Sequence, residues 1–323
     1  MTEGAGRFAR TVLGDVPADE LGIVDAHDHL FFRSRQLPGH ELDDADAAVS
    51  ELRGFRALGG RTVAQWTPYG LGRRAEALAA VAKAGDVHVI AATGMHQAAH
   101  YEPGVVENVY GRLDELFVEE LTVGMDGGTL PRAGMIKVAG GFHGLDDHAR
   151  TVMAAAARAH HATGAPIGVH HELGTASLDV LDLLCGRHGV PPERVILGHL
   201  NRFPDPSVHA EAGRAGAFLA FDGPSRANHA TDWRLFDLLA ALVEAGHADR
   251  LLLGGDTTTA AARASTGGGP GIPYLLRVMR PRIVRDLGEA VAEQIFVANP
   301  ARAFAVDWRG GDRPRAAGPG AAG

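Results

Sequence analysis

Eight short apolar runs, separated by segments of helical period, constrain the fold more than any other feature of this sequence. The runs are rich in Val, Ile and Leu, and a polar or glycine-rich stretch follows each of them. Continuous apolar strands that alternate with helices indicate a parallel sheet covered by helices. Because the eight repeats show no switch point, we expect an α/β fold closed into a (β/α)8 TIM barrel, with an open doubly wound sheet as the alternative. The runs are residues 21–27, 62–66, 87–93, 134–139, 166–170, 195–199, 217–222 and 251–256.

The helical segments and the chain ends predict a single domain with short extensions at both ends. Residues 1–20 should form a leader or short hairpin, with a strand at 11–13 and a turn at 14–17. Residues 21–308 should form the barrel, and residues 309–323, which lack periodicity, a disordered tail. Glycines mark several helix ends. Helices are predicted over 45–58, 74–84, 146–161, 177–188, 206–214, 233–245 and 290–298.

Composition excludes several classes of protein. The chain has 323 residues and a formal net charge of −8 with dispersed basic side chains, so nothing predicts a nucleic-acid surface. No apolar run approaches the roughly 20 residues of a membrane span, and the N-terminus lacks the apolar core of a signal peptide. The single cysteine, Cys185, excludes an internal disulfide and suits the cytoplasm. A small buried apolar residue is a simpler interpretation of Cys185 than a nucleophile.

The residues that end the runs are of the types that bind metal ions. In a barrel of this kind the active site gathers at the carboxyl ends of the strands. His27 and His29 end the first run, His170 and His199 the fifth and sixth, and Asp256 the eighth. Alternation along a strand points His27 and His29 to the same side. A lone histidine at such a place is more often structural, but five ligand-type residues at one rim predict a divalent-metal site.

The fourth run carries a lysine, Lys137, among apolar residues. A protonated amine beside metal cations is electrostatically unfavourable, and a buried lysine tends to lose its proton. A neutral amine can react with carbon dioxide to give an anionic carbamate, whose two oxygens could bridge two metal ions. The alternative is a salt bridge inside the barrel, for which Asp25 is the candidate partner.

These residues resemble the phosphotriesterase-like family of the amidohydrolase superfamily. The resemblance covers roughly residues 10–308 and is strongest towards the lactonase branch, to which the segment Gly267-Gly268-Gly269-Pro270-Gly271 is similar. It is carried by His27-Asp28-His29, Lys137, His170, His199 and Asp256, with supporting segments at 198–202, 221–223 and 299–302.

The resemblance implies a site with two divalent metal ions, most simply zinc, with manganese or cobalt compatible. His27, His29 and Asp256 would hold the more buried ion, His170 and His199 the more exposed one, and carbamylated Lys137 would bridge them. His171 competes with His170, but should point towards the helices. A bridging hydroxide would attack the substrate, and Asp256 would accept its proton and pass it to the leaving group. Because barrels of this family are often dimers, a homodimer is also implied.

Three departures from the family pattern bear on the substrate. Gly223 follows Asp222, where members that cleave organophosphates have a histidine. The segment after Asp256 lacks the Arg and Tyr of members that open phosphorylated lactones, so a phosphate group would have few partners there. Asn201 replaces a common Asp, which should affect the orientation of His199. The resemblance therefore indicates the class of reaction better than it indicates the substrate.

Three functions remain open for this chain. The first is a metal-dependent lactonase or carboxyl-ester hydrolase acting on a small molecule, with triester hydrolysis as a side reaction. The second is an amidase or deacylase of a small N-acyl compound, and the third is a binding protein with a silent metal site. Loop position makes several side chains candidates for substrate contact. These are Trp66, Tyr69, His96, Tyr101, Arg226, Asn228, His229 and Arg263.

Overall fold

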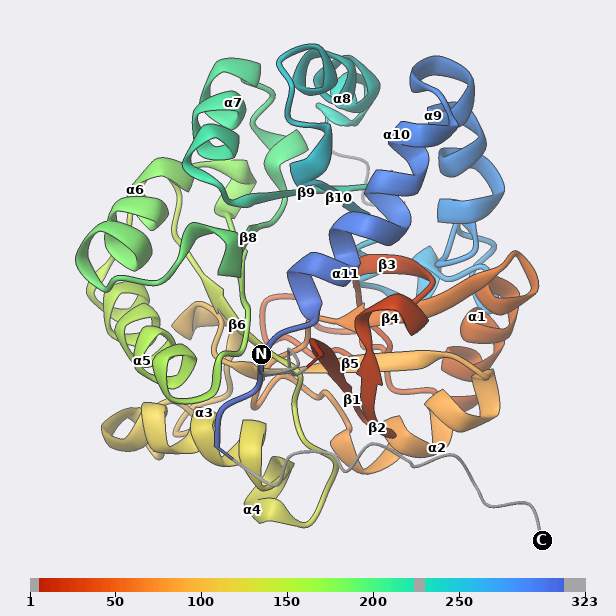
Figure 1. Cartoon of the computed structure of the whole chain (residues 1–323). Coiled ribbons are helices and arrows are strands. Elements are labelled where there is room, and N and C mark those ends of the chain that lie inside the picture. The colour runs from red at the N-terminus through yellow and green to blue at the C-terminus, as the bar shows by residue number, and fades with distance from the viewer. Residues whose placement is uncertain (1–5, 224–229, 311–323) are drawn as a thin grey trace, which may run out of the picture.

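The computed structural model describes residues 6–223 and 230–310, and it confirms the predicted barrel. Eight parallel strands are hydrogen-bonded in sequence order from β3 to β10. Asp256 N donates to His27 O at 2.9 Å, so the chain leaving β10 also contacts β3 and the barrel is nearly closed (Figure 1). The strands are β3 Ile23–Asp28, β4 Gly60–Gln65, β5 His88–Gly94, β6 Met135–Ala139, β7 Ile167–His170, β8 Val195–Leu197, β9 Phe218–Asp222 and β10 Leu251–Gly254.

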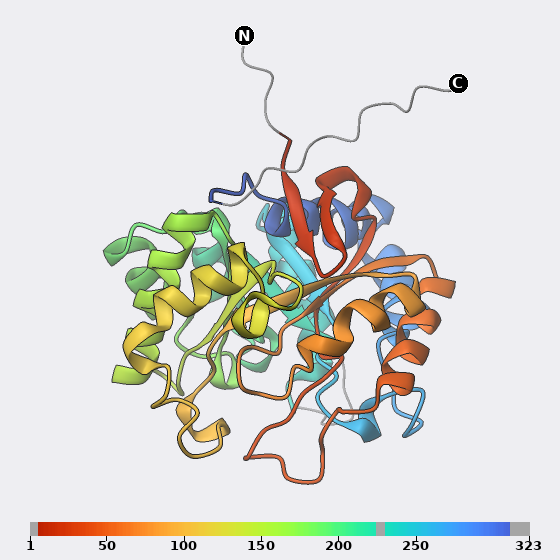
Figure 2. The same cartoon turned by 90° about the horizontal axis from the view of Figure 1, so that it is seen from below.

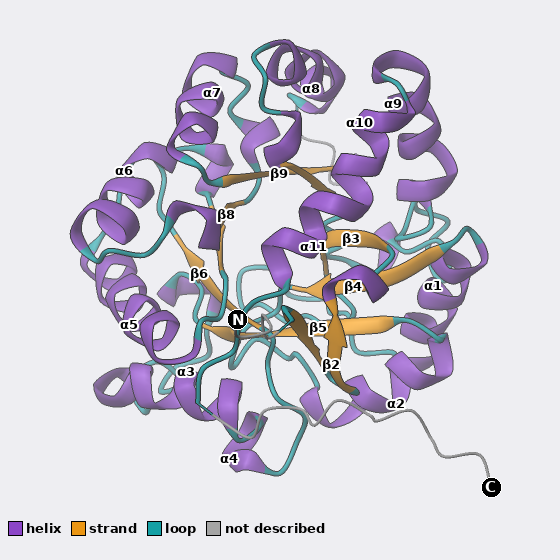
Figure 3. Ribbon diagram, viewed as in Figure 1, coloured by secondary structure: helices purple, strands orange, loops and turns teal. Residues whose placement is uncertain are grey.

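Helices surround this sheet on the outside (Figure 3). Aspartates begin several of them, since Asp44 and Asp146 each accept a hydrogen bond from the free backbone N–H of the first turn. None of the helices in the described part of the chain has the length and apolar character needed to cross a bilayer. The helices are α1 Ala45–Ala57, α2 Ala75–Gly85, α3 Leu113–Thr122, α4 Met125–Gly128, α5 Asp147–Thr163, α6 Ser177–Leu181, α7 Pro206–Ala215, α8 Leu235–Glu244, α9 Arg280–Leu287, α10 Glu289–Glu293 and α11 Asn299–Phe304.

Each predicted helix is present, although two continue as π-helical turns, Asp182–Arg187 after α6 and Gln294–Ala298 after α10. Helices α3, α4, α9 and α11 were not among the predicted segments. In α9 only Ile283 is buried, so the apolar period that reveals a helix is almost absent there. In α3 that period is present, because Leu113, Leu116 and Phe117 face the core.

The amino-terminal segment forms a hairpin that closes one end of the barrel. Strands β1 Phe8–Thr11 and β2 Gly14–Pro17 pair antiparallel, so the strand expected at 11–13 and the turn expected at 14–17 are wrong in position. Thr11 opposes Gly14, which leaves residues 12 and 13 as the loop. Figure 2 shows the hairpin and α11 at one end, and the long loops after β3 and β10 at the other. The tail predicted from residue 309 lies outside the described residues from 311 onward.

Two apolar cores hold these layers together. One lies between the strands and the outer helices. The other fills the barrel, where Val24 and Ala26 of β3 meet Met135, Ile196 and Phe218 of three other strands and side chains of the hairpin. Because parallel strands in such a barrel are buried on both faces, they read in sequence as continuous apolar runs.

His209 on α7 is a buried histidine that should make the fold sensitive to acid. Its side chain is 1% exposed, and neither ring nitrogen has a hydrogen bond of suitable geometry among the described residues, although the backbone of Leu200 and Phe203 lies near the ring. Burial lowers the pKa of His209 to about 4. Between that value and the unfolded pKa near 6.5 the unfolded chain binds the extra proton, so stability falls as the pH falls.

We therefore expect His209→Leu to gain stability over the parent chain by about 2 kcal/mol more at pH 5 than at pH 7. Urea unfolding at both pH values measures this difference. The exposed His40→Gln is the matched control and should show no such difference. A pH-independent gap between His209→Leu and the parent would mean that protonation of the buried ring does not limit stability in this range.

Candidate active site

The carboxyl ends of the strands surround a cavity of about 330 Å³. Seven of the residues singled out from the sequence line it, and they come from five strands and the loop after β5. All six candidate metal ligands therefore lie at one rim, together with one of the residues proposed for substrate contact. They are His27, His29, His96, Lys137, His170, His199 and Asp256.

The two histidines of the first strand face the cavity because β3 is irregular. Asp25 pairs with Val63 and Asp28 pairs with Gln65, so three steps along β3 oppose two steps along β4. The extra residue is a β-bulge, which re-aims the side chains that follow it. Without the bulge, Val24 and Ala26 inside the barrel would leave His27 on the outer face. Simple alternation explains why the two histidines share a side, but not which side that is.

His27, His29 and Asp256 form the first cluster of ligand atoms. The Nε2 atoms of His27 and His29 each lie 3.5 Å from Oδ1 of Asp256. All three side chains are almost fully buried. Burial opposes ionisation of Asp256, but His199 and Arg202 outweigh it and hold the pKa of this carboxyl well below its ordinary value. Asp256 is therefore a carboxylate at neutral pH.

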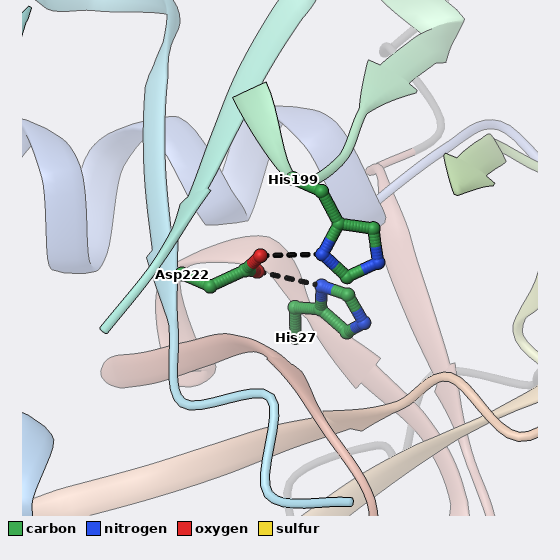
Figure 4. A group of neighbouring side chains, drawn as sticks. All are labelled: His27, His199 and Asp222. Atoms are coloured by element: carbon green, nitrogen blue, oxygen red, sulfur yellow. Dashed lines mark hydrogen bonds and ion pairs between the residues drawn. The ribbon is translucent and has the colours of Figure 1, made fainter. Parts of the chain in front are cut away.

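Asp222, at the end of β9, joins His27 to His199 (Figure 4). Its Oδ1 lies 3.0 Å from Nδ1 of His27, and its Oδ2 contacts Nδ1 of His199. A carboxylate on Nδ1 fixes the proton there, so Nε2 of the same ring keeps its lone pair. Asn201 accepts a hydrogen bond from the backbone N–H of Asp222 at 3.0 Å. The expected influence of Asn201 on His199 therefore passes through Asp222.

Backbone strain accompanies two of these positions. His199 has φ 61° and Asp256 has φ 51°, both in the left-handed region that side chains other than glycine rarely adopt. Strain of this kind persists only where the surrounding structure imposes it, and it gathers at functional sites. At His199 it turns the chain directly after the short strand β8, and the imidazole lines the cavity.

Lys137 is buried on β6 and lines the same cavity. Burial lowers the pKa of Lys137 to about 7, only partly offset by Asp256. The alternative of a salt bridge with Asp25 is wrong, since the Lys137 ammonium pairs with no carboxylate among the described residues. Asp25 instead accepts backbone N–H groups of His27 and Gly255, at 3.1 and 3.3 Å.

His170 also lines the cavity and has three neighbours there. The His170 ring lies 4.5 Å from His199 and 4.5 Å from His96, between ring centroids. Nε2 of His170 lies 3.3 Å from the Glu172 carboxylate, and the His96 ring stacks on His100. His171 does not line the cavity, since its Nδ1 bonds the carbonyl of Gly198 behind it.

Several residues proposed for substrate contact lie elsewhere. Trp66 is inside the barrel, where its ring stacks on His27 at 4.0 Å and its Nε1 donates to the carbonyl of Ala26. Tyr69 and Tyr101 do not line the cavity, and the Tyr101 hydroxyl accepts the backbone N–H of His96. Arg263 is buried, with its guanidinium on backbone carbonyls. Loop position suggested contact, but burial directs these side chains inward. Arg226, Asn228 and His229 lie outside the described residues.

The sequence analysis did not assign four polar residues that the structure brings to the site. Asp222 ends the seventh apolar run, as other candidate ligands end theirs, so its position in the sequence could have identified it as a site residue. Arg202 lines the cavity and contacts both Asp256 and Asp222. Glu172 and His100 also line it, but they lie on loops whose path no local pattern predicts.

The donor set fits divalent metal ions. Two groups, His27 with His29 and Asp256, and His27 with His199 and Asp222, have ligand atoms within 4.8 Å of one another. Nδ1 of His27 and Oδ1 of Asp222 are buried without a hydrogen bond of suitable geometry among the described residues. Imidazole nitrogens and carboxylate oxygens crowded in this way are the usual ligands of zinc and similar ions.

Comparison with known proteins agrees with this geometry. The model of the Phosphotriesterase family matches residues 8–304. A phospho-furanose lactonase of Mycoplasmopsis synoviae is 32% identical, over 93% of this chain and 92% of the relative. A lactonase structure from Listeria monocytogenes superposes with a TM-score of 0.84 at 28% identity, covering 93% of this chain and 99% of that one. An N-acetyltaurine hydrolase of Salmo salar is 25% identical, over 91% of this chain and 96% of the relative.

Proposed function

The chain belongs to the phosphotriesterase family, and on that premise we propose that it is a hydrolase that uses two divalent metal ions to cleave a lactone or carboxylic ester. The observation that carries this proposal is the convergence of four histidines, Asp256 and a buried lysine around one cavity, with Asp222 in contact with two of the histidines. Bound at this site, the metal ions would supply a water of lowered pKa and polarise the substrate carbonyl.

We assign the ligands by their place in the cavity. His27, His29 and Asp256 would hold the first ion, because their ligand atoms face one another. His170 and His199, whose rings are adjacent, would hold the second. Zinc is our first choice, with manganese and cobalt compatible. The single cysteine supports a reducing compartment, which we propose is the cytoplasm.

Lys137 would join the two sites as a carbamate. Only two of the 31 basic side chains are lysines, Lys83 and Lys137, so arginine is the usual cation of this chain. An arginine cannot lose its proton, whereas a buried lysine without a carboxylate partner can. The neutral amine would add carbon dioxide and release one proton, which gives an N-carboxylate with two free oxygens. This chemistry explains why a lysine occupies this position.

The remaining side chains position the reactants and protons. Asp256, held as a carboxylate by Arg202, would accept the proton of the attacking water. Nδ1 of His96 accepts the backbone N–H of Gln97, which places the proton of the neutral ring on Nε2. Because His96 lines the cavity, this N–H is a donor for the substrate or its leaving group.

The described lining favours a small uncharged substrate. Phe32, Leu37, Thr258 and Thr259 complete the wall, and Arg202 is already engaged by the two aspartates. A phosphate group would therefore compete with Asp256 for the same guanidinium. We propose an unphosphorylated lactone first, with slow triester hydrolysis as a side activity.

A panel of γ- and δ-lactones, phosphorylated lactones and N-acyl amines, with a pH-indicator readout, tests the proposal. We expect turnover of lactones. Turnover of amides alone would favour the second candidate, a deacylase, which the likeness to the N-acetyltaurine hydrolase and the donor on His96 support. Far fewer than two metal ions per chain, with no turnover, would favour the third candidate, a binding protein without catalytic activity.

Asp222→Asn should weaken metal binding about 10–100-fold with little change in fold. The amide lacks the negative charge that contacts Nδ1 of His27 and binds Nδ1 of His199, so the group that sets the tautomer of both rings is weakened. Competition with a metal chelator measures the affinity, and the exposed Asp182→Asn is the control. Complete loss of one ion would instead make Asp222 a direct ligand.

A further inference from the structure

A second polar cavity lies at the amino-terminal ends of the strands, away from the candidate active site. Its volume is about 320 Å³, within the range of about 300–1,000 Å³ for small-molecule sites. Residues just before β8, β9 and β10 line it, together with α11 and the residue before β1. We call it the arginine pocket, lined by Arg7, Arg194, Arg250 and Arg302 with Glu193, Gly216 and Phe218.

The charge of this lining is unusual for the chain. Four arginines face a single glutamate there, in a protein whose formal net charge is −8. Asp249, outside the lining, contacts Arg250 at 3.4 Å and Arg302 at 3.9 Å. Arg7 and Arg194 have no carboxylate within ion-pair distance among the described residues. The pocket therefore keeps an excess of positive charge.

Backbone carbonyls hold the guanidiniums of Arg194 and Arg250 in place and leave part of their hydrogen-bonding capacity unused. Nη1 of Arg194 donates to the carbonyls of Arg302 and Ala305, at 3.3 and 3.4 Å. Nη1 of Arg250 donates to the carbonyl of Gly216 at 3.3 Å. Each guanidinium carries five N–H donors, so several remain for a ligand.

Phe218 forms an apolar base under two of these cations. The guanidinium carbons of Arg250 and Arg302 each lie 5.8 Å from the centre of its ring. Burial, and then the charge of Arg7, lower the pKa of Arg194 and outweigh the opposing effect of Glu193, as expected where like charges gather. A bound dianion would relieve this repulsion and accept paired hydrogen bonds from the guanidinium forks.

We propose that the arginine pocket binds the phosphate group of a small phosphate monoester. This site is independent of the hydrolytic cavity, since the two lie at opposite ends of the strands. Phosphate fits the arrangement better than a single carboxylate does, because several guanidiniums approach the pocket from different elements and a phosphate offers more acceptor oxygens.

Isothermal titration calorimetry of the metal-loaded protein with ribose 5-phosphate tests this proposal, with ribose as the unphosphorylated control. We expect binding of ribose 5-phosphate and none of ribose. Arg7→Ala/Arg250→Gln should weaken binding at least about tenfold, because two charged donors are lost. The matched surface pair Arg158→Gln/Arg282→Gln, which removes the same charge, should stay within about twofold.

Two further variants distinguish binding in the arginine pocket from binding in the hydrolytic cavity. Arg7→Ala alone should fold normally, since the Arg7 side chain makes no ion pair or hydrogen bond to a described residue, and it should still weaken binding. Asp256→Asn should bind the ligand as the parent does. The proposal fails if the parent does not bind at millimolar concentration, if the surface pair weakens binding equally, or if only Asp256→Asn abolishes it.

Discussion

Lys137→Ala should lose at least about 10³-fold in kcat/KM for the best lactone and should retain less metal than the parent. The variant removes the group that we propose as the bridge between the two ions, together with its negative charge. A short carboxylic acid added to the assay should restore part of the activity, because it can occupy the vacated space and supply two oxygens. Steady-state kinetics and metal analysis on the same preparation measure both effects.

The chain supplies its own control for this experiment, since Lys83 on α2 is the only other lysine. Lys83→Ala should leave activity and metal content unchanged. Lys137→Arg should be inactive and should not respond to the added acid, because the longer cation fills the space and cannot form a carbamate. Parent-like activity of Lys137→Ala would remove Lys137 from the mechanism.

Asp256→Asn should lower kcat about 10²–10⁴-fold, because the amide cannot accept a proton. In the parent chain His199 and Arg202, against the effect of burial, hold the pKa of Asp256 well below its ordinary value. The carboxylate is therefore available throughout the neutral range, and activity should be limited on the acid side by other groups. A pH profile of kcat compares the two proteins.

Loss of metal would also inactivate Asp256→Asn, so metal content must be measured with the kinetics. A variant that keeps both ions and loses kcat supports proton transfer by Asp256. A variant that loses an ion assigns Asp256 to metal binding first. Unchanged kcat with full metal content would contradict both roles.

The acid sensitivity that we predict for this fold comes from His209, a residue that the sequence analysis did not single out. Local sequence does not indicate this, because the polar and apolar neighbours of a histidine on a helix do not reveal whether its nitrogens find partners. The packing of α7 against β9, where the His209 ring meets Phe221 at 5.6 Å, decides that. Buried, unpartnered polar groups are a property of tertiary contacts alone.

The sequence by itself determined the barrel and the identity of its main candidate ligands. Apolar runs of strand length mark each strand because both of its faces are buried, and the chain direction places every strand end at one rim. His27, His29, Lys137, His170 and Asp256 could therefore be found by asking what ends or interrupts each run.

Only the tertiary structure decided how these side chains are aimed and which partners they meet. The bulge in β3 turns His27 and His29 inward, and left-handed backbone at His199 turns the chain where β8 ends. Trp66 and Arg263, expected at the substrate, are instead buried, with the Trp66 ring stacked on His27 and the Arg263 guanidinium on backbone carbonyls. Arg202 forms ion pairs with Asp222 and Asp256. The reason is physical: strand periodicity is local, whereas bulges, buried ion pairs and loop paths depend on contacts between segments far apart in the chain.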